Sequence, residues 1–332
     1  MKILLITGPA GPTQGWGDMA TTDRIHQALI ASGFEASVAF ITSHEEFLSA
    51  IHKESFDLVW SALYHLDQDA SRVGIGGGEL WLADYMEQVG IPFVGSSAQC
   101  MRTMIDKAAT HKVLEDAGIP VPWQVSSDET DLDSLKDFPA FVKPRFESES
   151  AGITEASVSQ NTGQMTSRAR YIEDNFNQPA LIEEYLPGTE WTVSVLGNGN
   201  SRQLFPVVNN VNPARFKQYP VIREDLKGND AIVLSASSNE IQAKQASLLA
   251  NRSVEALGCL DHVRVDLKED KDGRLKVIEV NGIPGLNPIK SRSLRIHSLC
   301  HSSLTLEENF EILIASIVSS ALDRCGFPQA AS

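Results

Sequence analysis

The sequence predicts an α/β protein in which a parallel sheet with helices on its faces is followed by two further units. Three observations predict this class. Over the first hundred residues, short apolar strands alternate with helix-length segments, a pattern typical of parallel sheets. Later strands follow one another closely, and the last two read as a hairpin. The length of 332 residues is enough for two or three compact domains.

The N-terminal unit is expected to span residues 1–102. Its strands are expected at 2–7, 35–41, 56–63 and 91–96, and its helices at 23–32, 44–53 and 78–90. Thr22 is placed as the cap of the first helix, which stops at Gly33, and Gly90 closes the third helix. Ligands of such sheets bind beyond the carboxyl ends of the strands. A ligand site is therefore expected near residues 8–19, 62–69 and 95–100.

Residues 103–187 form the second expected unit, with a helix at 104–118 and strands at 139–146 and 180–186. The third unit, residues 188–328, has strands at 190–197 and 203–209, then an irregular stretch from 213 to 238. A long helix at 239–258 and a hairpin at 262–280 follow.

The composition restricts the class of partner. A net charge of -15 argues against a nucleic-acid groove or an anionic membrane surface as the main partner. The four cysteines are scattered without paired spacing, which fits a reducing compartment and argues against structural zinc. No stretch approaches the about 20 apolar residues of a membrane span. We therefore expect a cytoplasmic protein that acts on small molecules.

The hairpin carries the most specific chemistry. Its Asp272-Gly273 pair is typical of a two-residue type I′ turn, which places Asp266 opposite Glu279 and Arg264 opposite Asn281. These four side chains then project from one face, while the other face carries Val265, Leu267, Ile278 and Val280. Facing carboxylates destabilise a sheet unless something lies between them.

A divalent cation is one reason for such a pair. Two carboxylates with the amide oxygen of Asn281 suit Mg²⁺, whose remaining ligands are water and substrate phosphates. Arg264 beside them, and the backbone N–H groups of the loop 282–285, can stabilise an oxyanion. The competing interpretation is a solvated hairpin face with a charge network among Arg264, Asp266 and Glu279.

Two other stretches are candidates for nucleotide contacts. Lys143 ends a strand before a polar loop containing Ser148 and Ser150, where it can bind a phosphate as a point charge. Residues 182–191 place three glutamates, Glu183, Glu184 and Glu190, around the apolar pair Tyr185 and Leu186, which suits contacts to an adenine and its ribose. The alternative for Lys143 is a solvated lysine, and the alternative for residues 182–191 is a connector between domains.

Taken together, these stretches resemble the ATP-grasp superfamily, and within it the D-alanine–D-alanine ligase-like branch. The resemblance covers nearly the whole chain, through the segments 105–122, 141–152, 181–197 and 263–288 in the family's order. It implies two ATP-grasp subdomains that hold ATP between antiparallel sheets, with Mg²⁺ (or Mn²⁺) on the phosphates. It also implies a ligase that activates a carboxylate as an acyl phosphate for attack by an amine, and a homodimer.

The resemblance also implies roles for individual residues. Lys107 and Lys143 correspond to the phosphate lysines, Glu183 and Leu186 to adenine contacts, and Glu190 to the ribose contact. Asp266, Glu279 and Asn281 correspond to the metal ligands, and Arg264 with the Gly285 backbone to the oxyanion site. A further lysine over the γ-phosphate corresponds to Lys227, with Lys217 as the alternative.

Both substrate ends depart from the family. The loop after the first strand lacks the family's glutamate, and Asp18 is the candidate substitute. The family's His-Ser-Leu after the Pro-Gly is replaced here by Ile289-Lys290-Ser291, followed by Arg292 and Arg295. Lys290 and Ser291 then contact the substrate, or the segment is an ordinary basic helix start. We expect a substrate pair other than two D-alanines; the alternatives are a true D-alanine–D-alanine ligase or a silent nucleotide-binding regulator.

Overall fold

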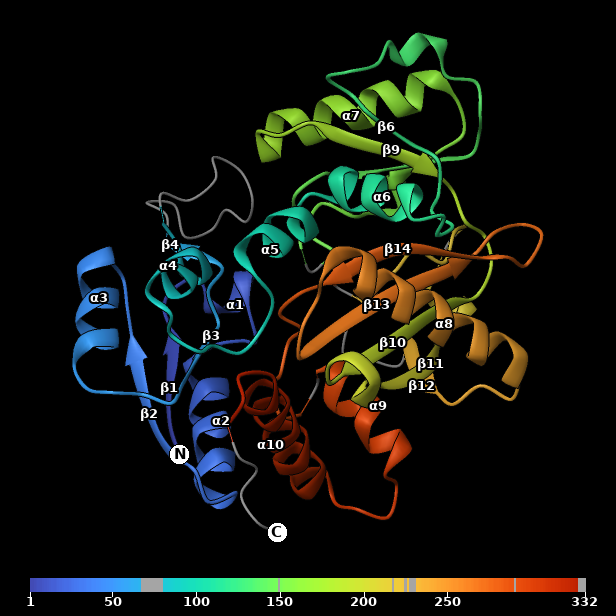
Figure 1. Cartoon of the computed structure of the whole chain (residues 1–332). Coiled ribbons are helices and arrows are strands. Elements are labelled where there is room, and N and C mark those ends of the chain that lie inside the picture. The colour runs from blue at the N-terminus through green and yellow to red at the C-terminus, as the bar shows by residue number, and fades with distance from the viewer. Residues whose placement is uncertain are drawn as a thin grey trace.

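The computed structural model describes residues 1–66, 80–148, 150–216, 218–223, 226, 231–289 and 291–327. Three parts follow one another along the chain and meet around the centre of the molecule, coloured blue, green and yellow to red in Figure 1. None of the helices within these ranges is both long and apolar enough to cross a membrane.

The first part is a three-stranded parallel sheet with helices packed on it. The sheet order is β2-β1-β3, and a short antiparallel pair, β4 and β5, follows. The strands are β1 (Lys2–Thr7), β2 (Glu35–Phe40), β3 (Leu58–Ser61), β4 (His65–Leu66) and β5 (Leu80–Trp81). The helices are α1 (Gly11–Gln14), α2 (Met19–Ala31), α3 (His44–His52), α4 (Leu82–Val89) and α5 (Ala98–Ile105).

Three expectations for this part are wrong. Leu80 and Trp81, expected within a helix, form β5, and α4 begins only at Leu82. Residues 91–96 do not form a strand but make a single parallel bridge, Val59 to Phe93. The cap of α2 is Asp18, whose carboxylate accepts the Thr21 N–H at 2.9 Å, so the helix starts one turn earlier than expected. Thr22 is instead buried inside the helix, where its hydroxyl accepts the indole N–H of Trp16 at 2.9 Å. The C-cap at Gly90 is confirmed, with φ 72°.

The second part is a four-stranded antiparallel sheet, ordered β6-β9-β7-β8, with α7 against one face. The elements are α6 (Lys107–Asp116), β6 (Gln124–Ser126), β7 (Ala140–Pro144), β8 (Val158–Ser159), α7 (Thr162–Phe176) and β9 (Ala180–Glu184). The helix expected at 104–118 is divided at Asp106, which ends α5 and caps α6. Short 3₁₀ turns lie at 132–134, 155–157, 199–201 and 213–215.

The third part is a five-stranded antiparallel sheet in the order β12-β11-β10-β13-β14. Its elements are β10 (Glu190–Leu196), β11 (Gln203–Val211), β12 (Ile232–Ser235), α8 (Glu240–Leu257), β13 (His262–Glu269), β14 (Leu275–Asn281), α9 (Arg292–Cys300) and α10 (Leu306–Arg324). β12 lies within the stretch expected to be irregular. One face of the sheet is apolar and packs against α8, α5 and α6; the other is polar.

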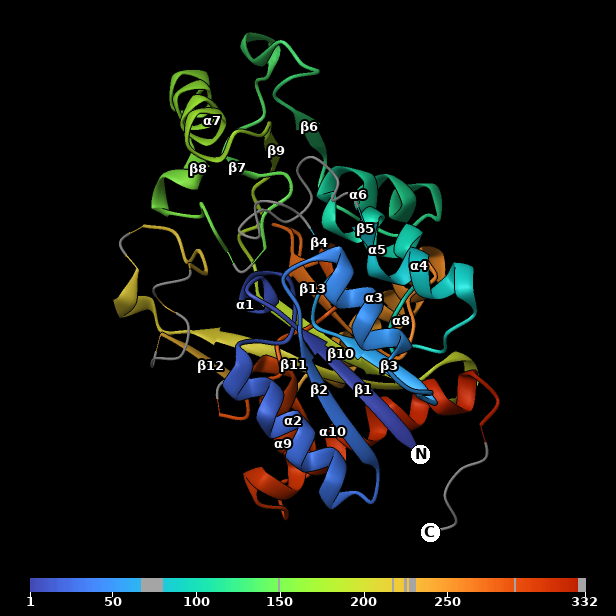
Figure 2. The same cartoon turned by 90° about the vertical axis from the view of Figure 1, so that its left-hand side faces the viewer.

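Helix α10 connects the third part to the first. It packs beside α2 near the N-terminal strands, as Figure 2 shows. Phe310, Leu313 and Ile317 share a core with Leu5 and Ile25. The same interface contains a buried charge: the Asp261 carboxylate accepts the Gly95 N–H at 2.7 Å and pairs with the Arg324 guanidinium at 2.8 Å.

Candidate active site

The residues of the β13–β14 hairpin face one another as the sequence predicts, but the turn that joins the two strands differs from the predicted type. Asp266 faces Glu279 and Arg264 faces Asn281. The turn is longer than two residues, since Glu269 pairs with Leu275 and only Gly273 of the Asp272-Gly273 pair has positive φ. A β-bulge then shifts the register, so that Leu267 faces Val277. The bulge offsets the longer turn and returns both carboxylates to one face.

The bulge also corrects the expected core face. Val265, Leu267 and Val280 are buried as expected, but Val277 is buried in place of Ile278, which is the extra residue of the bulge. The apolar face is therefore continuous despite the register shift.

Asp266 is the most constrained carboxylate of the polar face. It accepts hydrogen bonds from Thr192 Oγ1 at 2.8 Å, Asn281 Nδ2 at 3.2 Å and the Arg264 guanidinium at 2.9 Å. Burial favours its neutral form, but the charges of Arg264 and Arg292 and these hydrogen bonds outweigh it and hold the pKa of Asp266 below its usual value.

The two predicted phosphate lysines lie beside this face. Lys143 is buried and pairs with Glu183 at 2.7 Å. Lys107, the first residue of α6, lies with its Nζ 3.7 Å from Glu279 Oε1 and also donates to the Glu147 carbonyl. Burial lowers the pKa of Lys107, an effect that Glu279 opposes. The structure thus brings Lys107, Lys143, Glu183 and Glu279 together between the second and third parts.

The predicted adenine and ribose residues lie along the connection between β9 and β10. Leu186 is buried and Tyr185 is half-buried, its ring 5.2 Å from that of Tyr219; burial raises the pKa of Tyr185 to about 12. Glu184 pairs with Lys276 of β14, and Glu190 accepts the amide of Asn209 at 3.3 Å.

The glycine-proline loop after β14 is attached to the first part of the chain. Ile283 N–H donates to the Tyr64 hydroxyl at 3.1 Å, and Leu286 N–H donates to the Trp16 carbonyl at 2.9 Å. Gly285 lies between these two anchors, and a Cβ placed there would meet no described atom within 4 Å. Its backbone is therefore held while one side stays uncrowded, as the predicted oxyanion role requires.

The other predicted site residues lie in turns or at helix starts, or fall outside the described residues. Ser148 Oγ donates to the Thr13 carbonyl at 3.1 Å, and Ser150 lies in the same turn with φ 66°. Asp18 and Ser291 serve as N-caps of α2 and α9. Lys217, Lys227 and Lys290 lie outside the described residues.

The sequence predicts no role for Thr192 at this face or for Arg145 at the start of α6, and it names Arg292 only as one of the basic residues that follow Lys290. Arg292 lies 3.5 Å from Thr192 Oγ1 and 4.0 Å from Glu190 Oε1. Arg145 forms a fork with both oxygens of Asp106, each at 2.8 Å, and so fixes the start of α6. Extending the strand register to β10 would have found Thr192, but no local pattern marks Arg145.

The donor set fits a magnesium ion. Asp266, Glu279 and Asn281 offer two carboxylates and an amide on one face, and hard oxygen ligands of this kind bind Mg²⁺ with water or phosphate completing the shell. Among the described residues no three His, Cys, Asp or Glu side chains are grouped so that they could hold a metal ion by themselves.

His262 lies at the start of β13 on the same face as Arg264 and Asp266, and its burial gives a pH prediction. Burial, then the charges of Arg264 and His297, lower its pKa to about 3. An unfolded histidine binds a proton below about pH 6.5, so between about 6.5 and 3 the unfolded state binds more protons and stability falls with acidity, by up to about 1.4 kcal/mol per pH unit. Urea unfolding of His262→Gln at pH 7 and pH 5 is expected to show a smaller loss than the unchanged protein. The surface variant His44→Gln is the control, and an equal loss in all three proteins would contradict the assignment.

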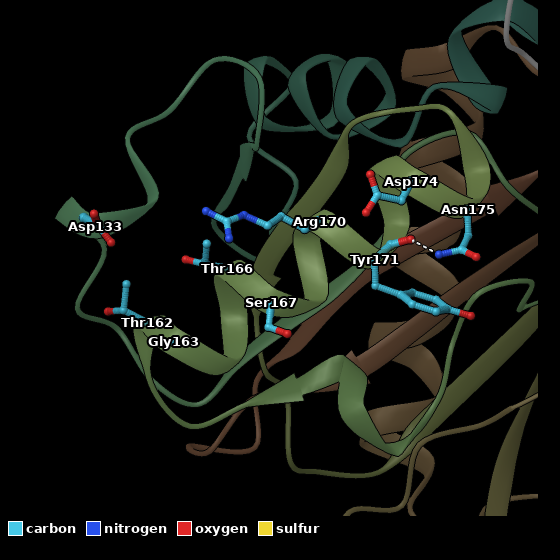
Figure 3. Close-up of a pocket in the computed structure, with 9 residues that line it drawn as sticks. All are labelled: Asp133, Thr162, Gly163, Thr166, Ser167, Arg170, Tyr171, Asp174 and Asn175. Carbon is cyan, nitrogen blue, oxygen red and sulfur yellow. Dashed lines mark hydrogen bonds between the residues drawn. The ribbon is translucent and has the colours of Figure 1, made fainter.

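A separate hollow lies on the outer side of α7 and contains none of these residues (Figure 3). It is lined by Asp133, Thr162, Gly163, Thr166, Ser167, Arg170, Tyr171, Asp174 and Asn175. The polar face of the third sheet remains the candidate active site.

Comparisons with known proteins identify the family of the chain. Residues 113–308, more than half of the chain, match the family model "D-ala D-ala ligase C-terminus". A D-alanine–D-alanine ligase of Haemophilus influenzae (strain PittEE) is 27% identical over 305 residues, covering 89% of this chain and 93% of the relative. An uncharacterized protein, y4sG, of Sinorhizobium fredii is 30% identical over 226 residues, covering 67% of this chain and 66% of the relative.

Solved structures have the same fold. The D-alanine–D-alanine ligase of Bacillus anthracis complexed with ATP superposes with a TM-score of 0.70 at 18% identity, covering 98% of this chain and 99% of that one. The enzyme of Coxiella burnetii gives a TM-score of 0.64 at 17% identity, covering 98% and 96%. The expected fold and the expected class, an ATP-dependent ligase, are confirmed. The chain belongs to the D-Ala–D-Ala ligase C-terminal family, in the D-alanine–D-alanine ligase-like branch of the ATP-grasp superfamily.

Proposed function

We propose that this protein joins a carboxylate to an amine in an ATP- and Mg²⁺-dependent reaction, in the cytoplasm and as a homodimer. The observation that carries the proposal is the facing pair Asp266 and Glu279, with Lys107 beside one carboxylate and Arg264 beside the other. Two opposed carboxylates are otherwise unfavourable in a sheet, whereas a metal-bound phosphate chain makes use of both them and the cations.

The reaction would proceed in two steps. A carboxylate oxygen of the first substrate attacks the γ-phosphorus of ATP; an O–P bond forms and the bond to the β-phosphate oxygen breaks, so ADP leaves. The amine of the second substrate then attacks the acyl carbon, a C–N bond forms, phosphate leaves, and the amine proton passes to phosphate or solvent. Bound Mg²⁺ would neutralise phosphate charge in the first step. Arg264 and the Gly285 N–H would stabilise the oxyanion of the second.

We further propose that the substrate pair is not two D-alanines. Asp18 is the sole carboxylate of the first loop, and it caps α2 instead of standing free for a substrate ammonium. Arg292 approaches the polar face from the segment after Gly285 and suits a substrate with an anionic group. The curated relatives bear the name D-alanine–D-alanine ligase, so that pair is the principal competing outcome.

The test is release of ADP and phosphate from Mg²⁺-ATP with D- and L-amino acids, offered singly and in pairs. We expect release that requires a particular pair, with formation of an amide product seen by mass spectrometry. Turnover with D-alanine alone would contradict the substrate proposal and leave the ligase proposal standing. Nucleotide binding without turnover across the panel would favour the non-catalytic regulator instead.

A further inference from the structure

Helix α6 presents two side chains to the third part of the chain, one helical turn apart. Residues four apart share a helix face, so Lys107 and His111 point the same way. Lys107 Nζ lies 3.7 Å from the Glu279 carboxylate, and His111 Nε2 lies 3.2 Å from the Ile278 carbonyl oxygen. The two contacts are therefore made with adjacent residues of β14.

Ile278 is the residue on which the register of the site depends. It is the extra residue of the β-bulge, between the pair Asp266–Glu279 and the pair Leu267–Val277. A slip of one residue turns every following side chain to the opposite face. Without the bulge, Glu279 would point to the apolar face, away from Asp266. The carbonyl of a bulged residue also stands outside the regular ladder and needs a donor from elsewhere.

The protonation of His111 follows from its surroundings. The side chain is only 1% exposed, and burial lowers its pKa, although Glu183 opposes this. A carbonyl oxygen can only accept, so Nε2 carries the hydrogen and Nδ1 does not. Nδ1 lies 3.7 Å from Glu183 Oε1, which brings the partner of Lys143 into the same cluster. The cationic groups that face it are Lys143 and Lys107, and both also favour the neutral ring.

We propose that His111 is a positioning residue of the active site: its Nε2–H holds the Ile278 carbonyl and thereby fixes the bulge that turns Glu279 toward Asp266. Through α6, the same imidazole keeps Lys107 beside Glu279. The inference rests on the proposed function, because it concerns the face on which Asp266 and Glu279 would bind the metal. His111 itself touches neither metal nor substrate.

The experiment measures metal binding without turnover. Mn²⁺ affinity is determined by electron paramagnetic resonance in the presence of a non-hydrolysable ATP analogue, for the unchanged protein, His111→Phe and His111→Gln. Phenylalanine fills the volume but donates nothing, and its Mn²⁺ affinity is expected to fall about tenfold, as for other groups that orient metal ligands. Glutamine can place an amide N–H where Nε2 stood, and its affinity is expected to stay within about threefold.

Controls keep the outcomes separate. His44→Phe, on exposed α3, should leave Mn²⁺ affinity unchanged, and thermal unfolding should confirm that each variant is folded. If the phenylalanine variant does not fold, His111→Asn takes its place, because its shorter amide does not reach the carbonyl. Equal Mn²⁺ affinity in all folded variants, or equal loss in the glutamine and phenylalanine variants, would overturn the role of His111 alone. Failure of the unchanged protein to bind Mn²⁺ with the analogue would overturn the proposed function as well.

Discussion

Glu279→Gln is expected to lower kcat about 100-fold or more while leaving the protein folded, because it removes one of the two charges that would hold Mg²⁺ at the transferring phosphate. The side chain faces Asp266, so the substitution also removes a like-charge pair. Because Glu279 is also the counter-charge of the buried Lys107, the two effects oppose each other and the melting temperature should change little. Turnover is measured with the substrates that the panel identifies, and melting by circular dichroism.

Asp272→Asn is the matched control for that variant. Asp272 is an exposed carboxylate in the turn of the same hairpin, so the change in net charge is identical. It should leave kcat unchanged. A Glu279→Gln enzyme with the turnover of the Asp272→Asn control would refute the metal assignment at this face.

Asp261→Ala is expected to lower the free energy of unfolding by about 3–5 kcal/mol, since it removes a fully buried carboxylate that pairs with the partly buried Arg324 guanidinium. The Gly95 N–H and the Asn198 amide, each 2.7 Å from the carboxylate, lose their acceptor at the same time. Asp261 also has φ 63°, a conformation that alanine adopts at a cost of about 1 kcal/mol or more.

Asp261→Asn separates these effects, because asparagine tolerates the same backbone conformation and keeps one acceptor oxygen. Its loss should be smaller than that of the alanine variant. Asp116→Ala breaks an exposed pair with Lys112 and should leave the stability nearly unchanged, because solvent screens such pairs. Equal urea midpoints for Asp261→Ala and Asp116→Ala would show that the buried contact contributes nothing to stability.

In the β13–β14 hairpin, the facing pairs could be predicted from the sequence, but the turn and the bulge could not. The opposition of Asp266 and Glu279 is as predicted, but it results from two departures that cancel, a longer turn and the bulge at Ile278. The local sequence does not predict the bulge, because isoleucine favours regular strand positions as well. The donor that meets it, His111, lies 167 residues away in the sequence.

Other differences arise in the same way. Asp18 and Thr22 are both good capping residues, and the choice between them depends on where the loop from β1 delivers the chain. Lys143 lies in β7 and its partner Glu183 in the neighbouring strand β9, so the sequence around either residue alone does not predict the ion pair. The sequence marks Arg292 only as one of several basic residues, because its approach to Thr192 depends on the path of the loop after Gly285.

The packing of α10 against α2 affects the order in which this molecule can assemble. Arg24 and Glu307 are paired across 283 residues of chain, and the apolar core around β1 and α2 includes side chains from α10. During synthesis, the first strands therefore leave the ribosome long before the helix that covers them. The second part has its own core, formed entirely within residues 123–182, and can fold while synthesis continues. The core around β1 and α2 is thus complete only after α10 has been made, whereas the core of the second part needs no later segment.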